Sequence, residues 1–225
     1  MCGIIAVASQ RDIAPILIEG LKRLEYRGYD SAGLAVLDKQ DNLSRIRARG
    51  KVQALALALE KKTLLGKIGL AHTRWATHGQ PSEHNAHPHI FEDKLALVHN
   101  GIIENFNELK QELAHKNYQF TSETDTEVVV YCLGEELKRT PSLLEAVQKT
   151  IARLEGTFAL AVISKEKPNS IIATRRGSPL VLGLGIGENY IASDVLALLP
   201  FTQEIIILEE GDIAVVSRDE YEIYD

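Results

Sequence analysis

The stretch TFALAVISKEKPNSIIATRRGSPLVLGL (157–184) contains three apolar runs rich in Ala, Val, Ile and Leu, separated only by short polar segments. Each run has the length of one β-strand, and no segment between two runs is long enough to hold a helix. Three more runs of the same kind follow along the chain: NYIAS (189–193), EIIILEE (204–210) and DIAVVSRD (212–219). Strands joined by short turns pair antiparallel, so this part of the sequence predicts antiparallel sheet. GLGIG (183–187) is interpreted as a hairpin turn, because Glu188 stands where a dinucleotide-binding loop needs its third glycine.

Before residue 157 the sequence mixes strands and helices. Apolar runs with β-branched residues predict strands at 2–9, 31–38, 43–50, 67–73 and 93–101. Helical spacing of apolar residues predicts helices at 13–24, 52–61, 106–116, 125–137 and 143–153. Asn105 and Ser142, each followed three residues later by Glu, have the spacing of capping boxes. Strands and helices do not alternate strictly, so we expect antiparallel sheets with helices on their outer faces rather than a doubly wound parallel sheet.

Composition limits the class of protein. The 225 residues carry a formal charge of −6, with 45% hydrophobic and 25% charged residues, which is typical of a soluble globular protein. This charge, and the lack of basic tracts, argue against a nucleic-acid or anionic-membrane surface. The cysteines are Cys2 and Cys132, too few for a disulfide framework, and the sequence has neither a membrane-length apolar stretch nor a signal peptide. We therefore expect a soluble, cytoplasmic protein.

Cys2 is the first candidate for chemistry. An initiator Met before a small side chain is normally trimmed, which would leave Cys2 with a free α-amine. The reference pKa of such an amine is about 8, so much of it is neutral at pH 7 and can take a proton. A thiol and a base on one residue match the pattern of an N-terminal nucleophile. The alternative is that Cys2 is a small buried residue at the start of a strand.

Two motifs in the first half of the chain suggest a substrate site. RGYDSAG (27–33) has two glycines around charged residues, which indicates a backbone held close to another group, although a helix C-cap also explains Gly28. HTRWATHG (72–79) leads from a strand into a long polar loop, in which Arg74 offers a guanidinium fork for a carboxylate and Thr77 a hydroxyl donor. The alternative role for Trp75, the single tryptophan, is a loop anchor packed on the core.

Two further motifs place polar groups at the ends of predicted elements. In HNG (99–101), the Asn100 amide and the Gly101 N–H can aim two donors at one point, as an oxyanion requires, but a simple Asn-Gly turn is the alternative. In SETDTE (122–127), the Asp125 carboxylate can clamp an ammonium group, but the alternative is that Asp and Thr here are ordinary helix N-caps.

Histidine is concentrated in one region. Six of the seven histidines fall between His72 and His99, but no cysteine lies among them to complete a zinc site. We interpret most of them as hydrogen-bonding residues around the site and expect no metal.

The motifs together resemble one family. They occur in this order along the chain: MCGI (1–4), LEYRGYDSAG (24–33), HTRWATHG (72–79), HNGIIEN (99–105), SETDTE (122–127) and LEEGDIA (208–214). In this order they resemble the glutaminase domains of the glutamine–fructose-6-phosphate aminotransferase family, the sugar-phosphate branch of the N-terminal-cysteine amidotransferases. The resemblance covers essentially all 225 residues, with no departure at a motif position.

The resemblance implies a fold and a domain organisation. Residues 1–225 would form one glutaminase domain, an α+β four-layer αββα sandwich of two antiparallel sheets of the N-terminal-nucleophile hydrolase type. The full-length protein would carry C-terminal sugar-isomerase domains that are absent from this chain.

The resemblance also implies catalytic roles. Cys2 would attack the side-chain amide of L-glutamine, and Arg27 would orient this N-terminal residue. Asn100 and the Gly101 N–H would hold the oxyanion. Ammonia would leave, and water would hydrolyse the γ-glutamyl thioester.

For substrate binding, the resemblance implies that Arg74, Thr77 and His78 hold the glutamine α-carboxylate. Asp125 would pair with the α-ammonium, and Trp75 would lie in a loop that closes over the substrate. No cofactor is implied. The full-length protein, expected to be a homo-oligomer, would pass the ammonia to fructose 6-phosphate.

Two other functions share part of this pattern. The same glutaminase chemistry can feed another acceptor, such as phosphoribosyl pyrophosphate, although RGYDSAG and HTRWATHG favour the sugar-phosphate branch. A non-catalytic module that binds an amino acid or a metal can use the same fold, but it would have no need of Cys2.

Overall fold

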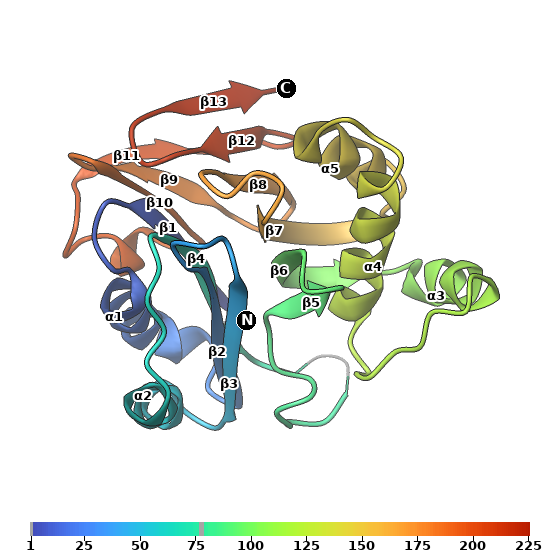
Figure 1. Ribbon diagram of the computed structural model, residues 1–225, viewed down its shortest axis with the longest axis horizontal. Coiled ribbons are helices and arrows are strands. Elements are labelled where there is room, and N and C mark those ends of the chain that lie inside the picture. The colour runs from blue at the N-terminus through green and yellow to red at the C-terminus, as the bar shows by residue number, and fades with distance from the viewer. Residues whose placement is uncertain (1, 77–78) are drawn as a thin grey trace.

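The computed structural model describes residues 2–76 and 79–225, and it contains two antiparallel sheets (Figure 1). The first sheet has seven strands, in the order β11 (Glu204–Ile207), β9 (Val181–Leu184), β10 (Glu188–Ala192), β1 (Gly3–Ser9), β4 (Ile68–Arg74), β2 (Ser31–Leu37) and β3 (Leu43–Arg49). The second has six, in the order β13 (Tyr221–Tyr224), β12 (Ile213–Val216), β8 (Ile171–Arg176), β7 (Gly156–Ser164), β6 (Leu95–Ile103) and β5 (His89–Phe91).

Helices cover the outer face of each sheet. Helices α1 (Ala14–Leu24) and α2 (Val52–Lys61) pack on the first sheet. Helices α4 (Asp125–Leu137) and α5 (Leu143–Ile151) pack on the second sheet, and α3 (Phe106–His115) packs beside α4. A third apolar cluster joins the two sheets across their inner faces. The layers are therefore helix, sheet, sheet and helix, and the expected four-layer αββα sandwich is confirmed.

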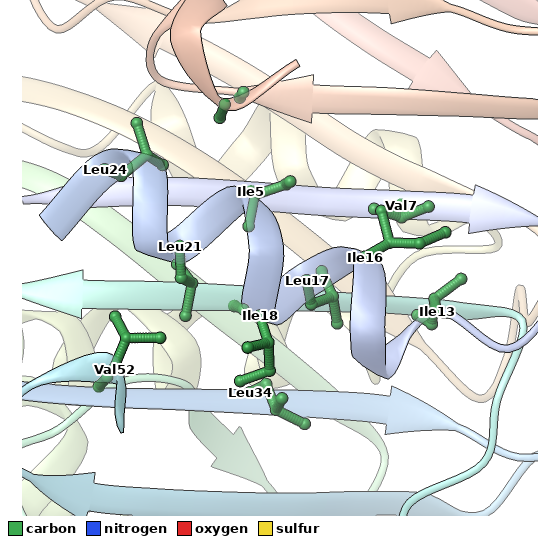
Figure 2. Packing of buried hydrophobic residues seen from close by; sticks show 14 of the residues in the cluster. Ile5, Val7, Ile13, Ile16, Leu17, Ile18, Leu21, Leu24, Leu34 and Val52 are labelled. Carbon is green, nitrogen blue, oxygen red and sulfur yellow. The ribbon is translucent and has the colours of Figure 1, made fainter. Parts of the chain in front are cut away.

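Strand β1 explains why the start of the sequence is apolar at consecutive positions. It lies between β10 and β4 and is buried along its whole length. Ile5 and Val7 belong to the cluster under α1, as Figure 2 shows, whereas Ile4 and Ala6 belong to the cluster between the sheets. Successive side chains of a strand point to opposite faces, so a strand covered on both faces needs apolar residues throughout.

Small residues fill much of the space between the sheets. Ala6 and Ala35 of the first sheet meet Ala96, Ala159 and Ala161 of the second in one cluster. Small side chains let the two backbones approach closely, and both β1 and β4 come into contact with β6. Strands β4 and β6 carry residues of the site described below, and β1 directly follows Cys2.

The structure differs from the sequence-based expectation in several places. Strand β6 continues through Asn100 and Gly101 to Ile103, so the interpretation of these two residues as a strand-ending turn is wrong. The long loop after β4 includes the short strand β5, which adds an edge to the second sheet. Asn105 precedes α3 but its side chain bonds to the backbone of residues 153 and 155 instead of capping the helix. Ser142 does cap α5, as predicted.

Two glycines inside helices test how tightly the outer layers pack. A Cβ on Gly134 of α4 would lie 2.2 to 2.4 Å from ring atoms of Phe91, whose ring also packs on Tyr118. A Cβ on Gly20 of α1 would lie 2.2 Å from the terminal methyl of Ile5, which can turn away.

We expect Gly134→Ala to lower the free energy of unfolding by about 1–3 kcal/mol. Gly20→Ala should lose clearly less, because the Ile5 methyl can move aside more easily than the Phe91 ring, while the helix propensity of alanine, about 1 kcal/mol, favours both variants alike. Urea denaturation measures both changes, and equal losses would contradict the packing argument.

Candidate active site

Cys2 stands immediately before β1, and its thiol lies against the backbone of Trp75. The Trp75 N–H donates to Cys2 Sγ at 3.3 Å, and Sγ lies 3.5 Å from the Trp75 carbonyl oxygen. Burial raises the pKa of the Cys2 thiol, and the hydrogen bond from Trp75 opposes this effect only in part. The thiol is therefore protonated at neutral pH, and it needs a base to become a nucleophile.

The RGYDSAG segment holds the Trp75 backbone in this place. A Cβ on Gly28 would lie 2.8 to 2.9 Å from backbone atoms of Arg74 and Trp75, so only glycine leaves room for the close approach. Gly28 also ends the short helix Glu25–Arg27 as its C-cap, with its N–H donating to the Glu25 carbonyl oxygen, so the helix-cap alternative is confirmed as well, although the backbone there is extended, with φ −178°. Asp30 fixes the peptide groups on both sides of Trp75. Its carboxylate accepts a hydrogen bond from the Ala76 N–H, and its backbone N–H donates to the Arg74 carbonyl oxygen at 3.1 Å.

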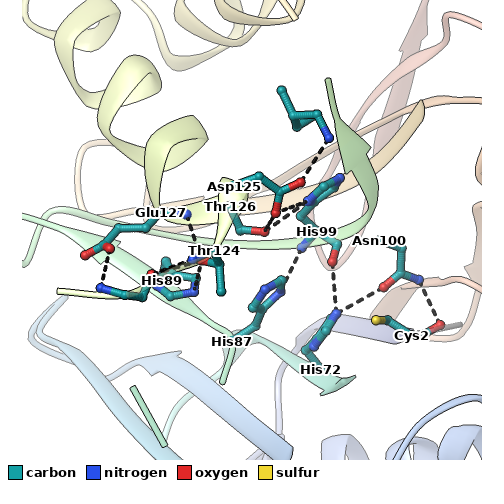
Figure 3. A network of polar contacts seen from close by, with 12 residues as sticks. Cys2, His72, His87, His89, His99, Asn100, Thr124, Asp125, Thr126 and Glu127 are labelled. Carbon is teal, nitrogen blue, oxygen red and sulfur yellow. Dashed lines mark hydrogen bonds and ion pairs between the residues drawn. The ribbon is translucent and has the colours of Figure 1, made fainter. Parts of the chain in front are cut away.

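Two side chains hold the Cys2 carbonyl oxygen. Arg27 Nε and Asn100 Nδ2 each donate to it at 3.1 Å, the latter drawn in Figure 3. Arg27 is in turn fixed by an ion pair with Asp194 at 3.1 Å, and Asp194 also accepts from the Tyr26 hydroxyl at 2.6 Å. This geometry supports the orienting role predicted for Arg27.

Asn100 and Gly101 lie on β6 of the opposite sheet. The Asn100 amide nitrogen carries two hydrogens, and the Cys2 carbonyl takes one, which leaves the other, among the described residues, for a substrate oxygen. Gly101 has φ +128°, and a Cβ there would lie 2.0 Å from the Thr157 carbonyl oxygen. A side chain at position 101 is thus excluded by both conformation and space.

A narrow pocket joins Cys2 to two side chains of opposite charge. It is lined by Cys2, Arg74, Trp75, Gly101, Asp125 and neighbouring residues. A guanidinium and a carboxylate beside one thiol are the groups that an α-amino acid with a reactive side chain requires.

The start of α4 explains the place of Asp125. Thr124 is the N-cap, because its hydroxyl accepts from the Glu127 N–H at 3.2 Å. Asp125 is the first helical residue, and its carboxylate accepts from the Ile103 N–H at 2.9 Å. The N-cap alternative is therefore confirmed for Thr124 and wrong for Asp125, whose buried carboxylate links α4 to the end of β6.

The other predicted binding residues lie where β4 ends. Arg74 is buried, and its guanidinium donates to the carbonyls of Gly79 and Gln80 at 3.4 Å. The Trp75 side chain is 48% exposed and meets the Tyr29 ring edge-on at 5.4 Å, so the alternative of a core anchor is wrong. Thr77 and His78 lie outside the described residues.

Histidines form a buried layer beside the site. The His72 and His87 rings stack with centroids 4.1 Å apart, and His87 meets His89 at 5.1 Å (Figure 3). His89 contacts the Thr124 hydroxyl at 2.9 Å, and His99 Nδ1 contacts the Thr126 hydroxyl at 3.0 Å. Among residues 2–76 and 79–225, no three His, Cys, Asp or Glu side chains are arranged to hold a metal ion.

Comparison with known proteins decides the family. The glutamine amidotransferase domain family matches residues 72–200, more than half of the chain. The chain belongs to the glutamine amidotransferase domain family. The amidotransferase chain is 56% identical, over all of its length, to a glutamine–fructose-6-phosphate aminotransferase [isomerizing] from Legionella pneumophila, and 57% identical to one from Photorhabdus laumondii. It spans only 37% of the length of each of these relatives.

Solved structures support the fold of this amidotransferase domain. A solved structure of a glutamine phosphoribosylpyrophosphate amidotransferase from B. subtilis superposes on this chain with a TM-score of 0.84 at 23% sequence identity. The match covers 99% of this chain and 49% of that protein. A glutamine aminotransferase class-II domain protein from Silicibacter pomeroyi matches with a TM-score of 0.67 at 16% identity, covering 100% of the chain and 99% of that protein. At these identities the likeness concerns the fold alone. In the described part of the chain, no helix has the length and apolarity needed to cross a bilayer.

Sequence reasoning missed three side chains that shape the amidotransferase site: His72, Asp30 and Asp194. The first two lie inside recognised motifs, but the sequence does not show that they bond to Asn100 and to the Trp75–Ala76 backbone. Asp194 lies in none of the motifs, and only its ion pair with Arg27 in the folded chain reveals it.

The buried histidines predict acid sensitivity. Burial lowers the pKa of His72 to about 3 and holds the pKa values of His87 and His89 well below the usual range. Below about pH 6.5 the unfolded chain binds protons at these histidines, whereas the folded protein keeps them neutral. The stability that the neutral rings contribute above that pH is therefore lost as the pH falls. Each histidine should lower the free energy of unfolding by about 1.4 kcal/mol per pH unit between pH 6 and 4.

Urea denaturation at several pH values checks this expectation. His89→Gln keeps a polar group for Thr124 but removes one titration, and it should make the slope shallower by about 1.4 kcal/mol per pH unit. His115→Gln, on the exposed face of α3, is the matched control and should leave the slope unchanged. An unchanged slope in His89→Gln would mean that this ring is protonated in the folded state.

Proposed function

We propose that this chain hydrolyses L-glutamine to L-glutamate and ammonia through a γ-glutamyl thioester on Cys2. The observation that carries the proposal is the placement of the Cys2 thiol in a pocket with Gly101, Arg74 and Asp125, next to the Asn100 amide. The pocket thus combines a nucleophile, donors for an oxyanion and two charges for the ends of an amino acid. Membership of the amidotransferase family supports this chemistry.

The base in this proposal is the α-amine of Cys2, which requires removal of Met1. Burial keeps the thiol protonated, so a base must act within reach of Sγ. The buried histidines that hold low pKa values are poor candidates, whereas an α-amine on the same residue titrates at about 8. It accepts the thiol proton, directly or through a water, as Sγ attacks the glutamine amide carbon.

The reaction then proceeds in two halves. Attack forms a C–S bond and a tetrahedral oxyanion, which the second N–H of Asn100 and the Gly101 N–H stabilise. The protonated α-amine returns its proton to the leaving nitrogen, the C–N bond breaks, and ammonia departs. Water then attacks the thioester, with the α-amine again as base, and glutamate leaves as the C–S bond breaks.

Substrate binding follows from the charges at the pocket. The Arg74 guanidinium pairs with the α-carboxylate, and Thr77 and His78 are proposed as further donors to the same group. Asp125 pairs with the α-ammonium, and Trp75 closes the mouth of the pocket over glutamine. Because Arg74 and Asp125 are both buried, their ion pairs with the two ends of an amino acid would form in a site of low dielectric, where such pairs are stronger than in water.

The parent protein uses the ammonia in a further reaction. We propose that residues 1–225 are one glutaminase domain and that C-terminal sugar-isomerase domains accept the ammonia to make glucosamine 6-phosphate from fructose 6-phosphate. The names and lengths of the relatives from Legionella and Photorhabdus support this acceptor over phosphoribosyl pyrophosphate. We further propose a cytoplasmic, homo-oligomeric full-length enzyme, since a thiol nucleophile needs a reducing compartment.

Two variants test the chemical roles. Cys2→Ala should abolish glutamate release and leave the fold intact, because it removes only the sulfur at the start of β1. Asn100→Ala should lower kcat by about 10²- to 10³-fold, the usual loss for one oxyanion donor. A coupled assay of glutamate release measures both, with urea denaturation as the folding control. Full turnover by Cys2→Ala would refute the nucleophile, and a kcat within a few fold for Asn100→Ala would refute the oxyanion role.

The chain alone should hydrolyse glutamine without any sugar phosphate. Every group proposed for hydrolysis, from Cys2 to Asp125, lies within these residues. Glutamate release should therefore be the same with and without fructose 6-phosphate, and no amino sugar should form. Parallel assays of glutamate and of amino sugar give the answer. A strict requirement for the sugar would show that the chain holds an acceptor site of its own.

A further inference from the structure

His72 of β4 makes a direct hydrogen bond between the two sheets at the active site. Its ring nitrogen Nε2 lies 3.1 Å from Asn100 Oδ1 and 3.0 Å from the His99 carbonyl oxygen (Figure 3). His72 belongs to the first sheet, as does the strand that Cys2 precedes, whereas Asn100 belongs to the second. The His72 side chain is fully buried, so water does not compete for these bonds.

This contact fixes which way the Asn100 amide points. A backbone carbonyl can only accept a hydrogen bond, so the His99 oxygen requires that His72 Nε2 carries the hydrogen. An Nε2–H can only donate, and it must therefore face the oxygen of the Asn100 amide rather than its nitrogen. Asn100 Nδ2 is then directed to the Cys2 carbonyl, 3.1 Å away. A flipped amide would place oxygen against oxygen at Cys2 and hydrogen against hydrogen at His72.

We infer that His72 is a positioning residue for glutamine hydrolysis, which holds the Asn100 amide with its N–H groups toward the reacting carbonyl. The inference rests on the proposed role of Asn100 in binding the oxyanion. An oxyanion donor is effective only when it is already aimed before charge develops, because reorienting a dipole during the reaction costs part of the stabilisation.

The surroundings of His72 keep its ring in one orientation. His87 stacks on it at 4.1 Å with the ring planes 25° apart. Gly33, directly across the strand pair from His72, makes room for the chain at His87, because a Cβ there would lie 2.1 Å from the His87 carbonyl oxygen. The second glycine of RGYDSAG thus permits the stack, as the first permits the approach of Trp75.

His72 is not suited to act as a base itself. Its Nε2 hydrogen is engaged by two acceptors, and burial lowers the ring's pKa to about 3. Its effect on the reaction must therefore pass through Asn100, and this dependence can be measured.

A double-mutant cycle with glutamate release as the assay tests the inference. His72→Phe keeps an aromatic ring for the His87 stack but removes the donor, and we expect kcat to fall about tenfold with KM changed less than threefold. His72→Gln keeps an N–H donor and should recover most of the activity. Adding His72→Phe to Asn100→Ala should cost nothing further, because the positioning residue has lost the group that it positions.

Ligand binding separates positioning from a general structural effect. An aldehyde analogue of glutamine adds Cys2 to its carbonyl and forms a tetrahedral adduct with an oxyanion, whereas glutamate binds without one. His72→Phe should weaken the aldehyde by about the same factor as kcat and leave the Kd of glutamate unchanged. Urea denaturation measures the stability of each variant. The buried His89→Phe variant is the control for an effect that comes from lost stability alone.

The outcomes distinguish this inference from the proposed function. If Asn100→Ala retains its kcat, the oxyanion role of Asn100 fails and the inference fails with it. If Asn100→Ala loses activity but His72→Phe does not, the inference alone is overturned. It is also overturned if the two losses add in the double variant, or if glutamate and the aldehyde weaken equally.

Discussion

The site depends on the contact between two sheets at the position where β1, β4 and β6 meet. Cys2 leads into a strand of the first sheet, and Asn100 and Gly101 lie on a strand of the second. The thiol and the proposed oxyanion donors belong to residues far apart in the sequence, so the covalent chain does not set the distance between them. That distance is set by how the inner faces pack, and the bonds from Asn100 to the Cys2 carbonyl and to His72 fix it directly.

Close packing at this contact explains residues that have no chemistry of their own. Alanines between the sheets let the backbones approach, and Gly28, Gly33 and Gly101 remove side chains where another backbone passes. In each case a Cβ would collide with a main-chain atom that is held by a strand or by the loop after β4. Interiors this dense cannot relax around an added methyl group, so the glycines support the catalytic geometry as firmly as the polar residues do.

Burial also decides the electrostatics of the site. It raises the pKa of the Cys2 thiol and lowers those of His72, His87 and His89, so the thiol and the rings are neutral around pH 7. The neutral rings serve as fixed hydrogen-bonding groups. Arg74 and Asp125 also line the pocket, and their side chains are of opposite charge, like the two ends of an amino acid. In the proposed reaction, proton transfer is left to a group that titrates near neutral pH, and the α-amine of Cys2 would supply it once Met1 is removed.

The sequence by itself determined the elements and most of the site. Apolar runs and turn residues predicted the strands, apolar spacing predicted the helices, the capping box at Ser142 predicted the start of α5, and the motifs named Cys2, Arg74, Asn100, Gly101 and Asp125 as candidates. Only the tertiary structure decided that β6 runs through Asn100 instead of turning there, because local Asn-Gly preference was overridden by pairing with β7. It also decided that His72 faces Asn100 and that Asp194 holds Arg27. Such contacts join residues far apart in the chain, and they exist only after the two sheets have packed.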